Sequence, residues 1–241
     1  MRLRPAPVGF VAGGMALGQL LPSVASLGQW LPVRRVGRCA WRGAAHGPPG
    51  RVALTFDDGP CPDSTPALLD RLDELGVRAT FFPSGAAVAR HAAVAGEVVS
   101  RGHQVETHGY HHRHHLWSSP WWIGADLDAA LAVMAGVGVC PRWLRPPYGQ
   151  VSTGTVLAAR RRGLGLAMWS AWGREWVATD ARAVARRVGA ALSPGAVVLL
   201  HDSDEFSPPG SARRAHDAVG FLVDELARRG MIPVTLDEVV Q

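Results

Sequence analysis

The chain has 241 residues, of which 47% are hydrophobic, and its formal net charge is +5. This length and apolar content are enough for the core of one large α/β domain, which excludes a mainly disordered protein. All 25 basic residues are arginine, a bias that weakens any argument from arginine clusters, and no nucleic-acid-binding motif is present, so we predict no nucleic-acid partner.

The first predicted element is an apolar stretch, residues 8–33, which is long enough to span a bilayer. Pro22 interrupts it, and Ser23-Val24-Ala25 fits a signal-peptide cleavage site. Three alternatives stay open: a signal peptide, a membrane anchor, and a helical extension that packs on the domain or on a membrane surface.

This pattern divides the chain into two parts. We expect residues 1–45 to form the apolar N-terminal segment and residues 46–241 to form the main folded domain. Residues 8–33 predict export or membrane association, so a secreted or membrane-anchored protein of the cell envelope is favoured over a cytoplasmic one.

From residue 51 onward, short apolar runs alternate with longer helical patterns. Strands are predicted at residues 51–56, 78–82, 103–107, 143–145, 165–169, 196–200 and 231–235. Helices are predicted at residues 65–76, 85–101, 123–136, 152–163, 180–192 and 211–229. This alternation favours a parallel sheet with helices outside it, and about seven such units favour a barrel or near-barrel.

Polar side chains follow several of the predicted strands at the point where each ends. Asp57 and Asp58 follow the first strand, His108 the third, Arg145 the fourth, and His201 the sixth. In parallel barrels the functional residues gather at the carboxyl ends of the strands, so we expect these side chains to meet at one mouth.

A histidine-rich stretch, H-G-Y-H-H-R-H-H, begins at His108. His108 and His112 are four residues apart and can share a metal ion from one face of a helical turn. His111 and His115 have the same spacing, but His108 lies closer to the strand end where Asp58 is expected. One carboxylate and two imidazoles form a divalent site with open positions, which is typical of a catalytic metal; a solvated histidine-rich loop is the alternative.

As a set, these motifs resemble the metal-dependent polysaccharide deacetylases, over residues 51–240. The segments T-F-D-D-G-P, H-G-Y-H-H, R-P-P-Y-G and L-L-H-D are similar to four motifs of that family, in the same order. Two departures stand out: Gly109 occupies a place where Ser or Thr is usual, and Glu175-Trp176 stands where Asp-Trp is common.

The resemblance implies a distorted (β/α)₇ barrel and a metal cofactor. It implies that Asp58, His108 and His112 hold Zn²⁺, or else Co²⁺, Mn²⁺ or Ni²⁺. Asp57 would be the general base that deprotonates a metal-bound water, and Arg145 would pair with it and hold it ionised.

The same resemblance assigns the remaining site residues. His201 would protonate the departing amine, and Glu175 would tune it. The backbone N–H of Tyr148 would help to bind the oxyanion, and Leu199 would line the pocket for the acetyl methyl group. Trp176 belongs to a group of tryptophans expected to stack on sugar rings near the mouth; the others are Trp117, Trp121, Trp122 and Trp172.

The implied reaction is hydrolysis of N-acetyl groups on an acetylated glycan that contains N-acetylglucosamine, with O-acetyl groups as a variant. A catalytically impaired sugar- or metal-binding module on the same fold is the second hypothesis, because of Gly109 and Glu175. A third, the all-helical HD phosphohydrolases, shares only the His201-Asp202 pair and conflicts with the β-forming run before it.

Overall fold

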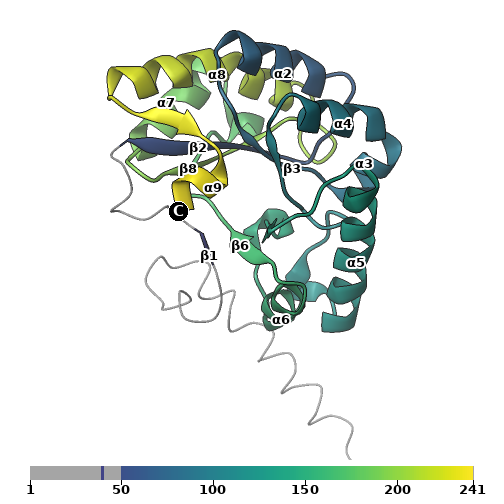
Figure 1. Cartoon of the computed structure of the whole chain (residues 1–241). Helices are drawn as coiled ribbons and strands as arrows, with labels where there is room; N and C mark the ends of the chain where they lie inside the picture. Colours follow the sequence, from purple (N-terminus) through teal and green to yellow (C-terminus); the bar gives the residue numbers. More distant parts are fainter. Residues whose placement is uncertain (1–38, 41–49, 241) are drawn as a thin grey trace, which may run out of the picture.

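The structure, a computed structural model, describes residues 39–40 and 50–240. Parallel strands form a ring with helices around its outside (Figure 1). The ring strands, in chain order, are β2 (Arg51–Asp57), β3 (Thr80–Phe82), β4 (Gln104–Val105), β5 (Trp143–Leu144), β6 (Gly165–Ala167), β7 (Ala171–Trp172) and β8 (Val197–His201).

Two sheets make up the ring. Strands run in the order β4-β3-β2-β8-β7 in one sheet, and β5 pairs with β6 in the other. A parallel bridge between Thr107 and Leu144 joins the two sheets on one side. On the other side the chain passes from β6 into β7 within a few residues, and these two strands are not paired with each other. The predicted α/β barrel is therefore confirmed, with a distortion at this junction.

Two short strands were not predicted. Strand β7 is only two residues long, and a strand of that length has no alternating pattern to detect. Strand β1 (Cys39–Ala40) pairs in parallel with β6, so part of the expected N-terminal segment adds to the sheet. The predicted strand at 231–235 is β9 (Ile232–Val234), which pairs with the amino-terminal half of β2 and lies outside the ring order.

The helices are α2 (Thr65–Glu74), α3 (Gly85–Arg90), α4 (Ala92–Ser100), α5 (Pro120–Gly136), α6 (Thr153–Arg161), α7 (Ala181–Ala191), α8 (Ser211–Arg228) and α9 (Leu236–Val240). Short 3₁₀ turns occur at η2 (His115–Trp117), η3 (Pro147–Gly149) and η4 (Glu175–Val177). The single helix predicted at 85–101 is wrong: it divides at His91, where no Gly or Pro marks the break. Helix α9 was not predicted.

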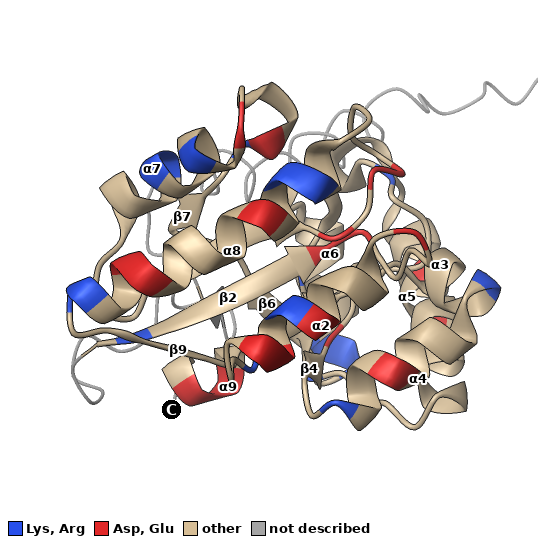
Figure 2. Ribbon diagram, turned by 90° about the horizontal axis from the view of Figure 1, so that it is seen from above, with Lys and Arg blue, Asp and Glu red and all other residues tan. Residues whose placement is uncertain are grey.

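The main core lies between the sheet and its outer helices. Figure 2 shows α8 and α2 along β2, and their apolar faces pack there on the side chains of β2 and β8. Leu54 and Phe56 of β2 contribute to this core, as does Leu222 of α8. Thr55 and Asp57 alternate with them, and both bond to a buried arginine of the site described below. Because both faces of β2 are covered, its sequence is a nearly continuous apolar run.

The expected apolar helical extension, residues 8–33, lies outside the described residues. Within the described ranges, no helix combines the length and the apolar character needed to cross a membrane.

Candidate active site

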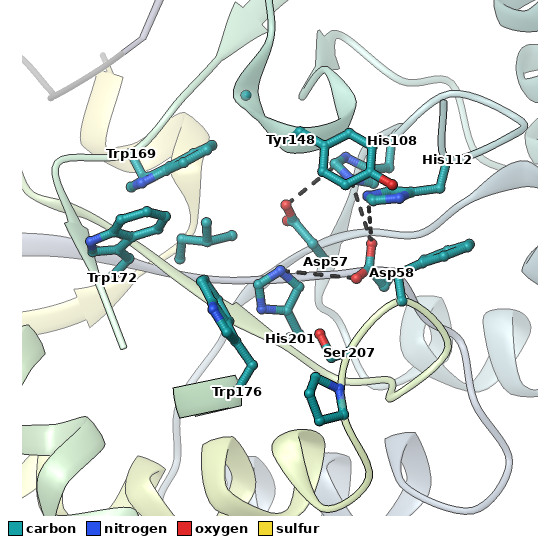
Figure 3. Close-up of a pocket in the computed structure, with 14 residues that line it drawn as sticks. Asp57, Asp58, His108, His112, Tyr148, Trp169, Trp172, Trp176, His201 and Ser207 are labelled. Atoms are coloured by element: carbon teal, nitrogen blue, oxygen red, sulfur yellow. Dashed lines mark ion pairs between the residues drawn. The ribbon is translucent and has the colours of Figure 1, made fainter. Parts of the chain in front are cut away.

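A cavity of about 340 Å³ opens at the carboxyl ends of the ring strands (Figure 3). Most of the predicted site residues line it: Asp57, Asp58, His108, His112, Tyr148, Trp176, Leu199 and His201. The other two, Arg145 and Glu175, are fully buried behind the wall and bond to Asp57 and His201 respectively. The structure thus brings all of them to one place.

The T-F-D-D-G-P turn aims two carboxylates into this cavity. Asp57 ends β2, and Asp58 has a φ of 81°, which turns the chain sharply. Asp202, which was not predicted as a site residue, fixes the turn: its carboxylate accepts hydrogen bonds from the N–H of Gly59 at 3.0 Å and the hydroxyl of Thr65 at 2.7 Å. A Cβ atom at Gly59 would lie 2.0 Å from Asp202 Oδ2, so only glycine fits there.

Asp57 is paired with the buried guanidinium of Arg145. Arg145 Nη1 donates to Asp57 Oδ1 at 2.6 Å and to Thr55 Oγ1 at 2.7 Å. Its other two nitrogens donate to the carbonyls of Ala167 and Met168, so each nitrogen of the buried guanidinium has a hydrogen-bond partner. Burial raises the pKa of Asp57 above its ordinary value, while Arg145 opposes this rise. A carboxylate with a raised pKa accepts a proton more readily than an exposed one.

Asp58, His108 and His112 direct their ligand atoms to one point (Figure 3). Asp58 Oδ1 lies 3.5 Å from His108 Nε2 and 3.6 Å from His112 Nε2. Although Asp58 Oδ1 is buried, no described residue donates a hydrogen bond to it. An orphaned carboxylate oxygen beside two imidazole nitrogens fits a divalent metal ion.

The protonation of these groups also suits a metal. Burial lowers the pKa of His108 well below its ordinary value and that of His112 to about 3, so both imidazoles are neutral and offer lone pairs. Burial raises the pKa of Asp58 to about 7, and the nearby carboxylates of Asp57 and Asp202 add to the rise. A bound cation would offset both the burial of the ionised Asp58 carboxylate and its repulsion by the neighbouring carboxylates.

Two other histidines of the stretch, His111 and His115, have partners in the fold. The carboxylate of Asp126 on α5 accepts hydrogen bonds from the N–H groups of Tyr110 and His111 and contacts His111 Nδ1 at 2.8 Å. His115 is buried against Thr155 of α6, with Nδ1 3.1 Å from the hydroxyl. His111 and His115 therefore do not form the competing metal pair that their spacing allowed.

The presence of glycine at position 109 has a local structural explanation. Its φ is 83°, a backbone conformation that glycine adopts without strain. A Cβ atom there would also lie 3.0 Å from Asp126 Oδ2, the oxygen that anchors the neighbouring N–H group. The departure from Ser or Thr at this position is thus matched to the path of the loop, and His108 and His112 keep their places.

His201 and Glu175 form a second charged pair. His201 Nδ1 lies 2.6 Å from Glu175 Oε1, and the Glu175 side chain is fully buried. Burial alone would lower the pKa of His201, but the hydrogen bond and charge of Glu175, together with the charges of Asp58 and Asp57, raise it to about 9. The imidazole is therefore protonated at neutral pH and can act as an acid.

Aromatic side chains form one wall of the cavity. Trp169, Trp172 and Trp176 line it in sequence, and Trp176 meets the His201 ring edge-on at 5.5 Å. Trp169 was not predicted, although its position just after β6 is the signal that could have found it. Trp117 and Trp121 are 80% and 86% exposed, and neither they nor Trp122 line the cavity, so the expectation that these three border the mouth is wrong.

The opposite side includes residues that sequence patterns did not single out. Phe206, Ser207 and Pro208 reach the cavity from the loop between β8 and α8.

Tyr148 has a φ of 57°, and none of the described residues accepts a hydrogen bond from its backbone N–H. That N–H is thus available for an oxygen of a ligand.

Comparison with known proteins agrees with this geometry. The family model described as polysaccharide deacetylase matches residues 44–167. A chitooligosaccharide deacetylase of Bradyrhizobium sp. (strain ANU 289) is 35% identical over 190 residues, which cover 74% of this chain and 85% of the relative. The peptidoglycan-N-acetylglucosamine deacetylase PgdA of Listeria monocytogenes is 36% identical over 153 residues, which cover 63% of this chain but 32% of that longer protein.

A solved structure has the same fold over most of this chain. The Bc1960 peptidoglycan N-acetylglucosamine deacetylase superposes with a TM-score of 0.81 at 26% identity, covering 88% of this chain and 98% of that one. The family model spans the part of the chain that carries Asp58, His108 and His112, and it ends before His201. The chain belongs to the polysaccharide deacetylase family.

Proposed function

We propose that this protein removes N-acetyl groups from an N-acetylglucosamine-containing polysaccharide or oligosaccharide of the cell envelope. The observation that carries the proposal is the convergence, in one cavity, of a possible metal site, a buried base paired with arginine and a protonated histidine. The relatives named as chitooligosaccharide and peptidoglycan deacetylases support this substrate class.

Asp58, His108 and His112 would hold the cation, with Zn²⁺ as the first candidate and Co²⁺, Mn²⁺ or Ni²⁺ as alternatives. When bound, it would supply Lewis-acid polarisation of the acetyl carbonyl and a lower pKa for the attacking water. These three side chains also keep the cation next to Asp57, the neighbour of Asp58 in sequence.

Asp57 accepts the proton of the attacking water, and Arg145 keeps its carboxylate oriented towards the cavity. The N–H of Tyr148 donates to the negative charge that develops on the acetyl carbonyl oxygen. When the C–N bond breaks, His201 gives its proton to the sugar nitrogen, and acetate and a free amine leave. Glu175 holds the imidazole in the orientation that makes this transfer possible.

The walls of the cavity suit an acetylated sugar. Leu199 and Trp176 provide apolar surface for the acetyl methyl group, and Trp172, which is 38% exposed, offers a face for a sugar ring at the rim. A glycan of the envelope places the enzyme outside the cytoplasm, either secreted or anchored through residues 8–33.

The decisive test is acetate release from N-acetylglucosamine oligomers and from peptidoglycan. We expect no release in the presence of chelator and restored release when Zn²⁺, Co²⁺ or Mn²⁺ is added. Absence of release with every metal, from a protein that nonetheless binds the metal, would contradict the proposal and favour the impaired sugar- or metal-binding module.

Glu175→Gln is expected to shift the alkaline limb of the pH–activity profile to lower pH. The Glu175 carboxylate helps to raise the pKa of His201 to about 9, so its loss moves that pKa towards the ordinary value near 6.5. The acid form is then depleted above the new pKa, and at pH 8 we expect kcat/KM to fall about tenfold. The measurement is kcat/KM between pH 5 and 10; superimposable profiles would remove Glu175 from the mechanism.

A further inference from the structure

The imidazole of His112 is held by aromatic rings and not by a hydrogen bond. The ring of Phe206 is stacked on it with centroids 4.2 Å apart and planes 15° apart. The ring of Tyr148 lies 4.3 Å away at 56°. His112 Nδ1 is buried, yet none of the described residues forms a hydrogen bond with it. Histidine ligands of metals usually use this second nitrogen to fix the plane of the ring, so another constraint must act here.

Phe206 is itself held in place by the loop that carries it. The carboxylate of Asp204 accepts a hydrogen bond from the N–H of Gly210 at 2.6 Å, which closes the loop onto the start of α8. Glu205 pairs with Arg90 of α3 at 2.5 Å, which ties the loop to that helix. The Phe206 ring is 42% exposed, so it contributes little to the core. Its neighbours are anchored: Glu205 by Arg90, and Ser207 by the hydrogen bond that its N–H donates to the Asp204 carbonyl.

We propose that Phe206 is a positioning residue for the metal site: its ring, together with Tyr148, fixes the plane of the His112 imidazole. In this orientation His112 Nε2 faces Asp58 Oδ1 at 3.6 Å. The inference rests on the proposed function, which needs a cation at Asp58, His108 and His112. Loss of the Phe206 ring frees the imidazole to rotate and admits water to its face, and both effects weaken metal binding.

The test is metal binding without substrate, because Phe206 also lines the cavity and its effect on activity would be ambiguous. The full chain is titrated with Co²⁺ and with Zn²⁺, and the visible absorption of bound Co²⁺ reports the ligand geometry. Phe206→Ala is expected to weaken affinity about three- to tenfold, the range of one aromatic pair, and to alter the Co²⁺ spectrum.

Three further variants separate stacking from simpler causes. Phe206→Trp keeps an aromatic face and should bind as the wild type does, whereas Phe206→Leu keeps apolar cover without a ring and should stay weakened. Phe221→Ala is the matched control, because Phe221 is 36% exposed, lies on α8 under the guanidinium of Arg182 from α7, and does not line the cavity. Its affinity should not change. Thermal melting of the metal-free proteins checks that every variant is folded.

The failures are distinguishable. If the wild type binds neither Co²⁺ nor Zn²⁺, the proposed function fails and this inference fails with it. If the wild type binds but Phe206→Ala shows the same affinity and the same spectrum, the positioning role alone is overturned. Wild-type affinity in Phe206→Leu would overturn it too, because apolar cover would then suffice.

Discussion

Asp57→Asn is expected to lower kcat for deacetylation about 10²- to 10⁴-fold, while the protein still binds its metal with nearly wild-type affinity. A positioned general base contributes an effect of this size, and an amide cannot take up the proton of the attacking water. The three predicted ligands are untouched by the change, since Asp57 bonds to Arg145 and is not one of them.

The substitution also has a cost in stability that must be measured beside activity. Arg145 is fully buried and would lose the one carboxylate that pairs with it among the described residues, although the Asn oxygen can still accept its hydrogen bond. We expect a loss of about 1–3 kcal/mol in the free energy of unfolding, less than for complete removal of the partner. Denaturant unfolding and metal titration supply the controls. Near-normal kcat in a metal-loaded Asp57→Asn protein would exclude Asp57 as the base.

The parts of the fold that were predictable are those with long patterns. Strands β2 and β8 are continuous apolar runs, and α8 repeats its apolar residues at helical spacing, so each was located within one or two residues. Strand β7 is two residues long and is defined by its pairing with β8, which is a tertiary fact. The break at His91 likewise has no Gly or Pro to announce it.

The residues of the site likewise fall into those that the sequence predicted and those that it did not. The motif residues were found because each stands at the end of an apolar run or in a distinctive cluster, and the structure brings them together; their catalytic roles stay predictions. Asp202 and Phe206 were missed for a physical reason. Asp202 acts through Gly59 and Thr65, far away in sequence, and Phe206 reaches His112 only because of the path of the loop. Contacts between residues so far apart produce no periodic pattern in the sequence.

The second large effect is expected for Asp58→Asn, which should abolish metal binding and activity without destabilising the metal-free fold. Asparagine tolerates a positive φ better than alanine does, so it fits the 81° backbone angle of this position. It also replaces a buried carboxylate, whose Oδ1 has no hydrogen-bond donor among the described residues, with a neutral amide. The metal-free variant should therefore be at least as stable as the metal-free wild type.

Thermal melting with and without metal makes this prediction measurable. A ligand at about 100 times its Kd stabilises the native state by about 2.7 kcal/mol, which corresponds to roughly 5–10 °C in Tm for a chain of this size. We expect that shift in the wild type and in the control Asp128→Asn, which alters an exposed partner of Arg162. Asp58→Asn should show no shift and no acetate release. A metal-dependent rise in its Tm equal to that of the wild type would mean that the cation binds elsewhere, because a site built on the Asp58 carboxylate loses its only anionic ligand in this variant.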